Sequence, residues 1–311
     1  MEIENVKLNW KPLIEFQKKE YLKKYPFSEI DRIFDSLEKM LDQNSIPSRV
    51  VVGNGRVKAF AYLLDNHLFS NRINGYICFP EPELYSKETL GNIIQWMKSY
   101  SERKRSQLMI QDISGVDVEE GPLKLEGFLA LERFNMRIDL STYEPAPDVE
   151  PRDIEISDFS SFDLQEYLVA QRQSYEDSSE AVFLMPESED GRKALLNTVL
   201  EGAFGEILYD ASFLLKVRGK IAGGLLACSG LLRTDGRRIP LIEDLFVLKP
   251  YRNTGAGKAL LSRSLKSLRN ANHQLAELTV SSGNNALQLY EKTGFRKYGS
   301  PERMYLLGFK E

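Results

Sequence analysis

Apolar positions in the second half of the chain change repeatedly between helical and strand-like spacing. From Asp158 to Tyr175 they recur at helical spacing, with Asp158 as the expected N-cap, and a second helix is predicted over 191–200. The strand-like runs SFLLKV and IAGGLLACS flank a turn at 218–220 and predict a hairpin. A nearly continuous apolar run over 239–248 predicts a further strand.

The pattern continues to the end of the chain. From Thr254 onward, an apolar stripe faces a basic one and predicts an amphipathic helix; the apolar residues are Leu260, Leu261, Leu265 and Leu268. LAELTV predicts a buried strand, and 284–293 a short helix that Gly294 ends in the left-handed conformation. MYLLGF predicts a last strand. A helix separates the strands at 239–248 and 275–280, so we expect these two to be parallel neighbours.

The first half repeats this plan. RVVVGNGRVKAFAYLL predicts a hairpin around Asn54-Gly55, and INGYICF, KETLGNIIQWMKSY and QLMIQDIS predict a strand, a helix and a strand. Three landmarks recur at nearly one offset: Pro82 with Pro250, Ser114-Gly115 with Ser282-Gly283, and Gly127-Phe128 with Gly294-Phe295. We interpret this register as an internal duplication.

A proline-rich segment separates the two halves. TYEPAPDVEPRD holds Pro145, Pro147 and Pro151, which cannot continue a helix or a central strand. With 311 residues the chain suits two domains. We place their boundary near Pro147 and expect a domain over 1–146 and another over 147–311. The predicted fold class is α/β, with a mixed central sheet flanked by helices in each domain.

Composition excludes several classes of protein. Hydrophobic residues make up 42% of the chain and charged residues 28%, which is typical of a globular protein. The net charge of −4 argues against a general nucleic-acid binder. Two distant cysteines and two histidines leave no disulfide framework and no multi-histidine or thiolate metal site. No apolar run is long enough to span a membrane, and the start lacks a signal peptide, so we expect a cytoplasmic protein with neither membrane nor nucleic acid as partner.

The most informative segment follows the strand at 239–248. The letters RNTGAGKA, from Arg252 to Ala259, form a glycine loop that opens a helix. The first N–H groups of a helix lack internal partners and carry the positive end of its dipole, and glycine lets an anion approach them closely. The segment therefore predicts a phosphate or pyrophosphate cradle, although an ordinary strand-to-helix turn with surface basic residues would show the same spacing.

Two other phosphate loops do not fit these letters. A P-loop ending at Gly257-Lys258 would need glycine at 252 and serine or threonine at 259, where the chain has Arg252 and Ala259. A dinucleotide-binding GxGxxG starting at Gly255 would need glycine at 260, where the chain has Leu260.

The chain instead resembles the GNAT-type N-acetyltransferases over about 150–311. RxxGxG before a leucine-rich helix is similar to the family's loop for the pyrophosphate of acetyl-coenzyme A, and ALQLYEKTGF to its A-x-x-L-Y-E-K-x-G-F helix. In one departure, Gly283 stands where many members have asparagine, and asparagines follow at 284 and 285. The resemblance implies acetyl-coenzyme A as cosubstrate and the following residues as its contacts: Leu245, Phe246, Val247, Arg252, Asn253, Thr254, Gly255, Ala256, Gly257, Lys258, Ala259 and Asn285.

The resemblance also implies two catalytic residues. Tyr290 would protonate the departing thiolate, and a phenol suits this because its pKa lies near that of a thiol. Glu243 occupies a position where many members place a carboxylate that draws a proton from the acceptor amine. By strand alternation we expect Asp244 to point to the other face of the sheet. A core tyrosine and a solvated strand residue are the alternatives for the two positions.

The sequence gives weaker evidence about the acceptor substrate. Between Arg172 and Arg192 lie six acidic residues and no basic one: Glu176, Asp177, Glu180, Glu187, Glu189 and Asp190. In GNAT proteins this region borders the acceptor site, and six acids would attract a cationic amine, although a solvated acidic loop would look the same. We expect a small-molecule or peptide amine as acceptor; the sequence does not indicate an oligomeric state.

The reaction expected from the resemblance is direct attack of a primary amine on the acetyl thioester, through a tetrahedral intermediate whose oxyanion meets a backbone N–H group. The domain over 1–146 lacks RxxGxG, so we expect a degenerate copy without a cofactor site. Two other functions remain open: a non-catalytic acyl-coenzyme A-binding regulatory or interaction protein of the same fold, and an aminoacyl-transfer relative that would bind charged tRNA.

Overall fold

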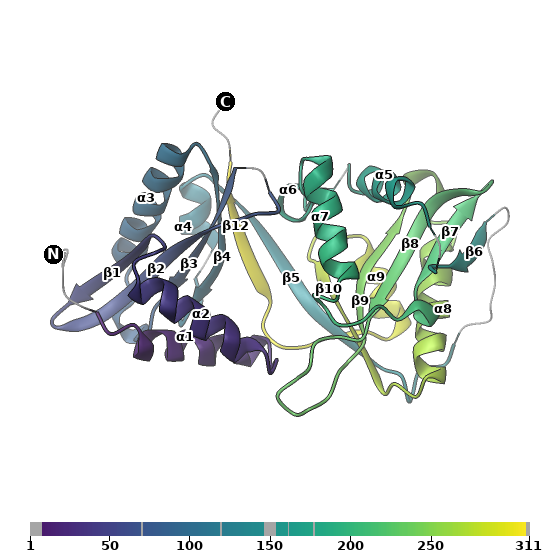
Figure 1. Ribbon diagram of the computed structural model, residues 1–311, viewed down its shortest axis with the longest axis horizontal. Coiled ribbons are helices and arrows are strands. Elements are labelled where there is room, and N and C mark those ends of the chain that lie inside the picture. The colour runs from purple at the N-terminus through teal and green to yellow at the C-terminus, as the bar shows by residue number, and fades with distance from the viewer. Residues whose placement is uncertain are drawn as a thin grey trace. The chain divides into compact units, whose positions relative to one another are not determined.

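The computed structural model describes residues 8–69, 71–118, 120–145, 154–160, 162–176 and 178–308. The chain divides into two compact units, which are best followed one at a time in Figure 1. Unit 1 comprises residues 1–132 and 302–311, and unit 2 comprises residues 133–301. Each unit is a mixed α/β sheet with helices on both faces, which confirms the predicted fold class.

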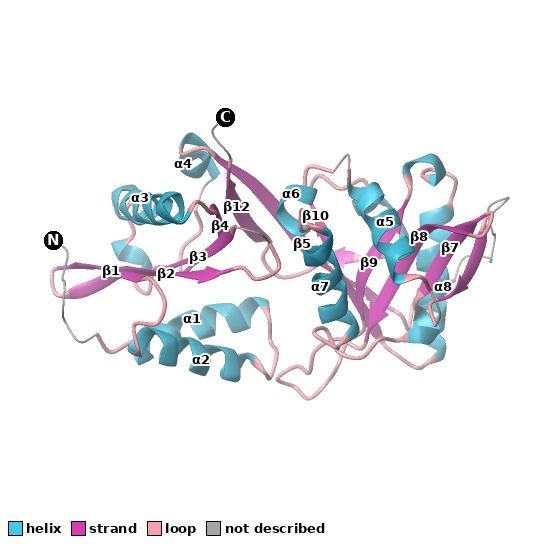
Figure 2. Cartoon of the chain, turned by 45° about the horizontal axis from the view of Figure 1, so that its top comes forward, coloured by secondary structure: helices cyan, strands magenta, loops and turns pink. Residues whose placement is uncertain are grey.

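Unit 1 places two pairs of helices on opposite faces of its sheet (Figure 2). The strand order is β1-β2-β3-β4-β12, followed by the first residues of β5. Apolar residues of α1 and α2 form a core on one face, and those of α3 and α4 form a core on the other. The elements are α1 (Lys11–Lys24), α2 (Ile30–Asp42), β1 (Ser48–Gly53), β2 (Arg56–Asp65), β3 (Arg72–Cys78), α3 (Lys87–Lys104), β4 (Gln107–Ser114), α4 (Glu120–Leu125), β5 (Phe128–Asp139) and β12 (Glu302–Leu307).

Unit 2 has the strand order β5-β10-β9-β8-β7-β6, with β11 paired to β5. The stripe of α8 packs on one face of this sheet, and α5 and α7 pack on the other (Figure 1). The elements are β6 (Glu155–Asp158), α5 (Leu164–Tyr175), α6 (Ala181–Leu184), α7 (Glu189–Leu200), β7 (Phe213–Val217), β8 (Lys220–Cys228), β9 (Leu241–Val247), α8 (Ala256–Asn270), β10 (Leu275–Ser281), α9 (Ala286–Thr293) and β11 (Arg296–Lys297).

Local chemistry explains most of the turns between these elements. Asn54 and Gly55 both have positive φ in the β1–β2 hairpin, as a two-residue turn with this twist requires. Gly294 ends α9 with φ +113°, as predicted. The helix expected from Asp158 begins later: Asp158 is the last residue of β6, and the side chain of Asp163 caps α5 by accepting from the Glu166 N–H. Both aspartates suit an N-cap, and only the second lies directly before the helix.

The two units repeat one order of elements. In unit 1, β3, α3 and β4 follow one another as β9, α8 and β10 do in unit 2, and in each case the two strands are parallel. The beginnings of β4 and β10, Gln107 and Leu275, keep the offset seen in the sequence. This recurrence supports an internal duplication.

The division between the units differs from the boundary expected near Pro147, a residue outside the described ranges. It falls within β5, whose residues 133–139 belong to unit 2, and again before β12, which belongs to unit 1. Residues 133–139 of β5 follow α4 of the first repeat but belong to unit 2, and β12 follows α9 of the second repeat but belongs to unit 1. The composition of the chain indicates a linker but does not indicate which sheet a strand joins, so the sequence did not predict this assignment of β5 and β12.

Candidate functional site

The parallel strands β9 and β10 of unit 2 separate after two residue pairs. Leu241 pairs with Glu277, and Ile242 pairs with Leu278. Beyond Ile242, β9 stays paired with β8 as far as Val247. Residues 243–247 therefore have one edge that pairs with no described strand, and we call it the open edge of β9.

Backbone groups of two predicted cofactor contacts face this open edge. The Leu248 N–H donates to Ala222 O on the β8 side, so by alternation Leu245 and Val247 turn their backbone groups away from β8. Phe246 differs, because its carbonyl oxygen lies toward Gly223 of β8. An extended ligand arm could thus pair with Leu245 and with the N–H of Val247 as an added strand would, since the Val247 carbonyl already accepts from Arg252. Phe246 packs against Tyr167 on the α5 face.

The loop predicted to hold a pyrophosphate lies between β9 and α8. We call residues 252–255 the cofactor loop; Asn253 and Gly255 have φ of +62° and +93°, a conformation that asparagine and glycine tolerate best. Gly255 is the N-cap of α8 and, having no side chain, makes no capping hydrogen bond. Within the described chain, no acceptor contacts the N–H groups of Ala256, Gly257 and Lys258, which leaves them available to an anion.

Gly257 brings the start of α8 close to the neighbouring elements. A Cβ atom built there would lie 3.6 Å from Leu289 of α9 and 3.7 Å from Val247 of β9, which is ordinary contact. The other predicted contacts, Thr254 and Ala259, lie on either side of this point, with the Thr254 hydroxyl donating to Tyr251 O. Any larger side chain at 257 would occupy the space beside the open edge of β9.

Arg252 links the cofactor loop to α5. Its Nε donates to Val247 O at 2.9 Å, and one terminal nitrogen donates to Ser174 O at 2.5 Å. The sequence indicated Arg252 as an added charge at the cradle. The structure shows it bonded to carbonyl groups of β9 and α5, so that it also fixes the position of the loop.

A β-bulge at Glu243 changes the direction of its neighbour. Register against β8 runs from Asp244–Leu226 to Ile242–Ala227, so Glu243 has no partner residue. Ile242 joins the core under α8, whereas Asp244 reaches α5 on the opposite face. Regular alternation would have put 242 and 244 on one face. The expectation that Glu243 and Asp244 point to opposite faces is therefore wrong, because the bulge places both on the α5 face.

The two carboxyl groups differ in their hydrogen bonds. Asp244 Oδ2 accepts from Tyr167 Oη at 2.9 Å and from Gln171 Nε2 at 2.6 Å, and both donors belong to α5. Among the described residues, none donates to the carboxyl of Glu243. Burial raises the pKa of Asp244, and its donors oppose this shift. Burial and the adjacent charge of Asp244 raise the pKa of Glu243 to about 8, with Arg133 opposing. The two donors from α5 favour the ionised form of Asp244, and Glu243 has no such donor among the described residues.

Tyr290 lies on α9 with 7% of its surface exposed, its ring edge-on to Phe295. Burial, and after it the charges of Asp244 and Glu180, raise its pKa, so the phenol keeps its proton at neutral pH. Burial raises the pKa of Tyr175, at the end of α5, and the same two carboxylates and Tyr290 raise it further. A buried phenol close to several carboxyl groups can donate a proton to an anion that forms beside it.

The structure assigns different positions to the two asparagines before α9. Asn284 donates to Glu180 Oε1 at 2.7 Å and accepts from the Ala286 N–H at 2.8 Å. Asn285, the predicted cofactor contact, is the exposed N-cap residue, and its side chain makes no capping bond. The link from α9 to Glu180 had no signal in the sequence, since it joins residues that are 104 positions apart.

The six predicted acidic residues do not form one cluster. Glu180 is 7% exposed and lies near Tyr290, while Glu176, Glu187, Glu189 and Asp190 are exposed. Asp177 lies outside the described residues. Negative charge near Tyr290 therefore comes from Asp244 and Glu180, and sequence reasoning missed the role of Asp244 and its hydrogen-bond donors Tyr167 and Gln171.

The corresponding region of unit 1 is closed. β3 and β4 stay paired over seven residue pairs, from Arg72–Gln107 to Cys78–Ser114. The helix that follows β3 begins at a capped N-terminus, because Ser86 Oγ accepts from the Thr89 N–H at 3.1 Å. Unit 1 therefore has neither an open edge at β3 nor the uncapped helix start of α8.

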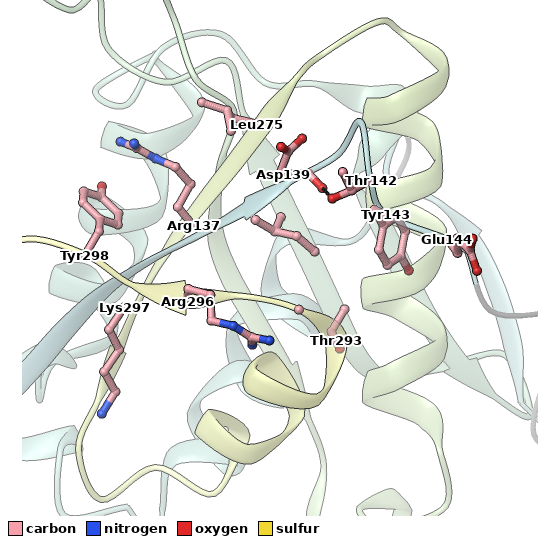
Figure 3. A pocket seen from close by; sticks show the side chains of 12 residues that line it. Arg137, Asp139, Thr142, Tyr143, Glu144, Leu275, Thr293, Arg296, Lys297 and Tyr298 are labelled. Atoms are coloured by element: carbon pink, nitrogen blue, oxygen red, sulfur yellow. Dashed lines mark hydrogen bonds between the residues drawn. The ribbon is translucent and has the colours of Figure 1, made fainter.

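The pocket drawn in Figure 3 lies elsewhere in unit 2, with a volume of about 460 Å³. It is lined by the end of β5, the start of β10, the end of α9 and β11, and Arg296 and Lys297 extend from β11 there. Leu275 is at the beginning of β10, whereas β9 and β10 separate toward the ends of the strands. The open edge of β9, the cofactor loop and Tyr290 do not line this pocket.

Two features are absent from the described part of the chain. No helix there is long and apolar enough to cross a membrane. No group of three or more His, Cys, Asp or Glu residues there could hold a metal ion.

Comparison with known proteins finds similarity to one protein family in the second half of the chain. The family model of the acetyltransferase (GNAT) domain matches residues 192–305. An uncharacterized N-acetyltransferase of Methanocaldococcus jannaschii is 27% identical over 90 residues, which cover 28% of this chain. The match spans only 40% of that relative's length.

Solved structures extend the likeness of fold to most of the chain. A GCN5-related N-acetyltransferase from Sphaerobacter thermophilus has a TM-score of 0.54 at 19% identity, covering 86% of this chain and 84% of that one. A GCN5-related glucosamine N-acetyltransferase region of a fungal multi-domain enzyme has a TM-score of 0.58 at 12% identity, covering 96% of this chain and 37% of that one. The part of the chain that matches the acetyltransferase (GNAT) family model, residues 192–305, includes the open edge of β9, the cofactor loop and α9.

Proposed function

We propose that unit 2 binds acetyl-coenzyme A and transfers its acetyl group to a primary amine, with a preference for cationic acceptors. The observation that carries this proposal is the separation of β9 from β10 directly beside the uncapped start of α8. The open edge of β9 offers backbone groups to an extended ligand arm, and the start of α8 offers N–H groups to a pyrophosphate. The family match to residues 192–305 supports acyl transfer in general.

The residues present fit acetyl-coenzyme A. Leu245 and Val247 would pair with its pantetheine arm, and the N–H groups of 256–258 would bind its pyrophosphate. Gly257 leaves the space between them free. Bound there, acetyl-coenzyme A supplies an activated acetyl thioester.

Glu243 and Tyr290 supply the proton transfers in this proposal. Glu243 would take one proton from the acceptor ammonium, and the amine nitrogen would replace the sulfur on the acetyl carbon. Tyr290 would donate its proton to the sulfur, and its phenolate would take the second proton that the nitrogen loses on becoming an amide. A pKa of about 8 suits Glu243 to accept a proton near neutral pH, and the raised pKa of Tyr290 keeps its proton available.

The acceptor preference rests on buried charge. Asp244 and Glu180 are two carboxyl groups that act on both Tyr290 and Tyr175. Glu243 is adjacent to Asp244, and Arg133 is a cation that acts on Glu243. A protonated amine would be attracted to this surplus of negative charge. A small molecule and the lysine or N-terminus of a peptide both carry such an amine.

The test is release of coenzyme A thiol from acetyl-coenzyme A with a panel of acceptors: a monoamine, a diamine, an amino acid and a lysine peptide. We expect release that depends on the amine, with acetylated product in the mass spectrum, and loss of release in Tyr290→Phe. Binding of acetyl-coenzyme A without transfer to any amine would favour the non-catalytic acyl-coenzyme A-binding protein instead.

A further inference from the structure

Asp244 has a set of contacts that the proposed reaction does not use. Its carboxylate is held by Tyr167 and Gln171, one helical turn apart on α5, at 2.9 and 2.6 Å. Both donors favour the ionised form of a carboxyl group. Among the described residues, the carboxyl of Asp244 makes no hydrogen bond to the cofactor loop or to α9, so a direct role in the chemistry is not evident.

The bulge makes this carboxylate a neighbour of the base. It turns Asp244 to the α5 face, where Glu243 also lies, and the charge of Glu243 acts in turn on Tyr167 and on Cys228. Other charged or titratable groups that bear on Glu243 are Arg133 of β5, Cys228 of β8 and Tyr167 of α5. Among Asp244 and these three groups, only Asp244 is a carboxyl group that can place a negative charge beside Glu243.

We propose that Asp244 is a positioning residue for Glu243: held by Tyr167 and Gln171, its carboxylate fixes the bulge of β9 on α5 and keeps a negative charge beside the base. Without that charge, Glu243 would give up its proton at lower pH and would be a weaker base. This inference rests on the proposed function for its catalytic meaning, but the effect on Glu243 exists in the free protein.

The first experiment follows the carboxyl carbon of Glu243 by NMR in glutamate-labelled full-length protein, with the signal assigned by its loss in Glu243→Gln. We expect the titration midpoint of Glu243 to fall by about one pH unit in Asp244→Asn, the lower range for loss of a nearby like charge. Asp235→Asn is the matched control, because it removes an exposed carboxylate from the loop before β9. An unchanged midpoint in Asp244→Asn would overturn the proposal.

A second variant keeps the test decisive if Asp244→Asn does not fold. Tyr167→Phe removes one donor, so the aspartate-labelled carboxyl of Asp244 should titrate at higher pH than in wild type; no change would show that α5 does not hold the charge. Neither measurement needs acetyl transfer. If the wild-type protein transfers no acetyl group but the variants show the expected NMR shifts, the proposed function is contradicted and the inference about Asp244 is not.

The activity readout separates positioning from a merely structural role. In Asp244→Asn the rise of kcat/KM with pH should move to lower pH, together with the NMR midpoint. A structural role alone predicts a lower unfolding temperature and an equal loss of rate at every pH.

Discussion

Glu243 and Asp244 are consecutive in the sequence and lie on the same face of the sheet, because a β-bulge falls at Glu243. The pair has unequal surroundings: Asp244 accepts two hydrogen bonds from α5, and none from the described residues reaches Glu243. Two carboxyl groups whose environments separate their pKa values are a common basis for acid–base chemistry. Here the arrangement leaves Glu243 as the group that can exchange a proton near neutral pH.

Glu243→Gln should alter the pH–rate profile. In wild type, kcat/KM should rise up to about pH 8, where Glu243 ionises, and then level off. In the variant the amine must deprotonate without help, so its rate keeps rising above pH 8 and the loss shrinks there. Initial rates from pH 6 to 10 measure this; a loss of equal size at every pH would mean that Glu243 only positions the acceptor.

The same variant should change stability in a pH-dependent way. The pKa of about 8 means that the folded protein holds the Glu243 proton up to about pH 8, while the unfolded chain releases it near pH 4.5, the ordinary pKa of a glutamate. Folded Glu243 thus binds a proton more tightly, and wild-type stability falls as pH rises from about 4.5 to 8. The unfolding temperature of Glu243→Gln, relative to that of wild type, should rise as the pH is raised from 5 to 9. Glu155→Gln, an exposed change on β6, should show no such trend.

Tyr290→Phe should lower the rate of transfer by about 100- to 10,000-fold, the usual contribution of a general acid. Its affinity for acetyl-coenzyme A should change little, because the hydroxyl meets the sulfur mainly as charge develops there. Stopped-assay kinetics and calorimetry on one preparation test both parts, with Tyr209→Phe as an exposed control. Near-full activity would make Tyr290 a core residue without a chemical role.

Side chains added in the cofactor loop should weaken binding of acetyl-coenzyme A. Gly257→Val fills the space beside Val247 and Leu289, and Gly255→Val strains a residue with φ +93° and crowds the helix start. Loss of one or two charge-assisted bonds corresponds to a roughly 10- to 1,000-fold weaker affinity. Gly219→Val is the control for strain, since Gly219 also has positive φ but lies in the β7–β8 turn. Equal affinities in all three variants would remove the loop from the cofactor site.

Much of unit 2 could be predicted from local patterns. The hairpin of β7 and β8, the stripe of α8 and the Gly294 end of α9 all depend on residues close together in the sequence. The predicted parallel neighbours β9 and β10 are confirmed, because a crossover helix leaves few alternatives. In unit 1, by contrast, α1 and α2 were not predicted, although Ile30, Phe34, Leu37 and Leu41 form a helical stripe in α2.

The features that shape the candidate site were harder to predict. Whether β9 stays with β10 beyond Ile242 depends on the ends of both strands, and the bulge at Glu243 depends on register against β8. The spacing of apolar residues predicts neither the separation of the two strands nor the bulge. The bond from Tyr167 to Asp244 joins positions 77 apart, which no local pattern reports.

Hydrogen–deuterium exchange with and without acetyl-coenzyme A tests the central claim most directly, because it reports which backbone N–H groups the ligand covers. We predict slower exchange at Leu245 and Val247 on the open edge of β9 and at Ala256, Gly257 and Lys258 at the start of α8. Residues 78–90 of unit 1, where β3 stays paired with β4 and Ser86 caps α3, should exchange at the same rate in both samples. Protection confined to unit 1, or an unchanged β9 and α8 under saturating ligand, would contradict the assignment.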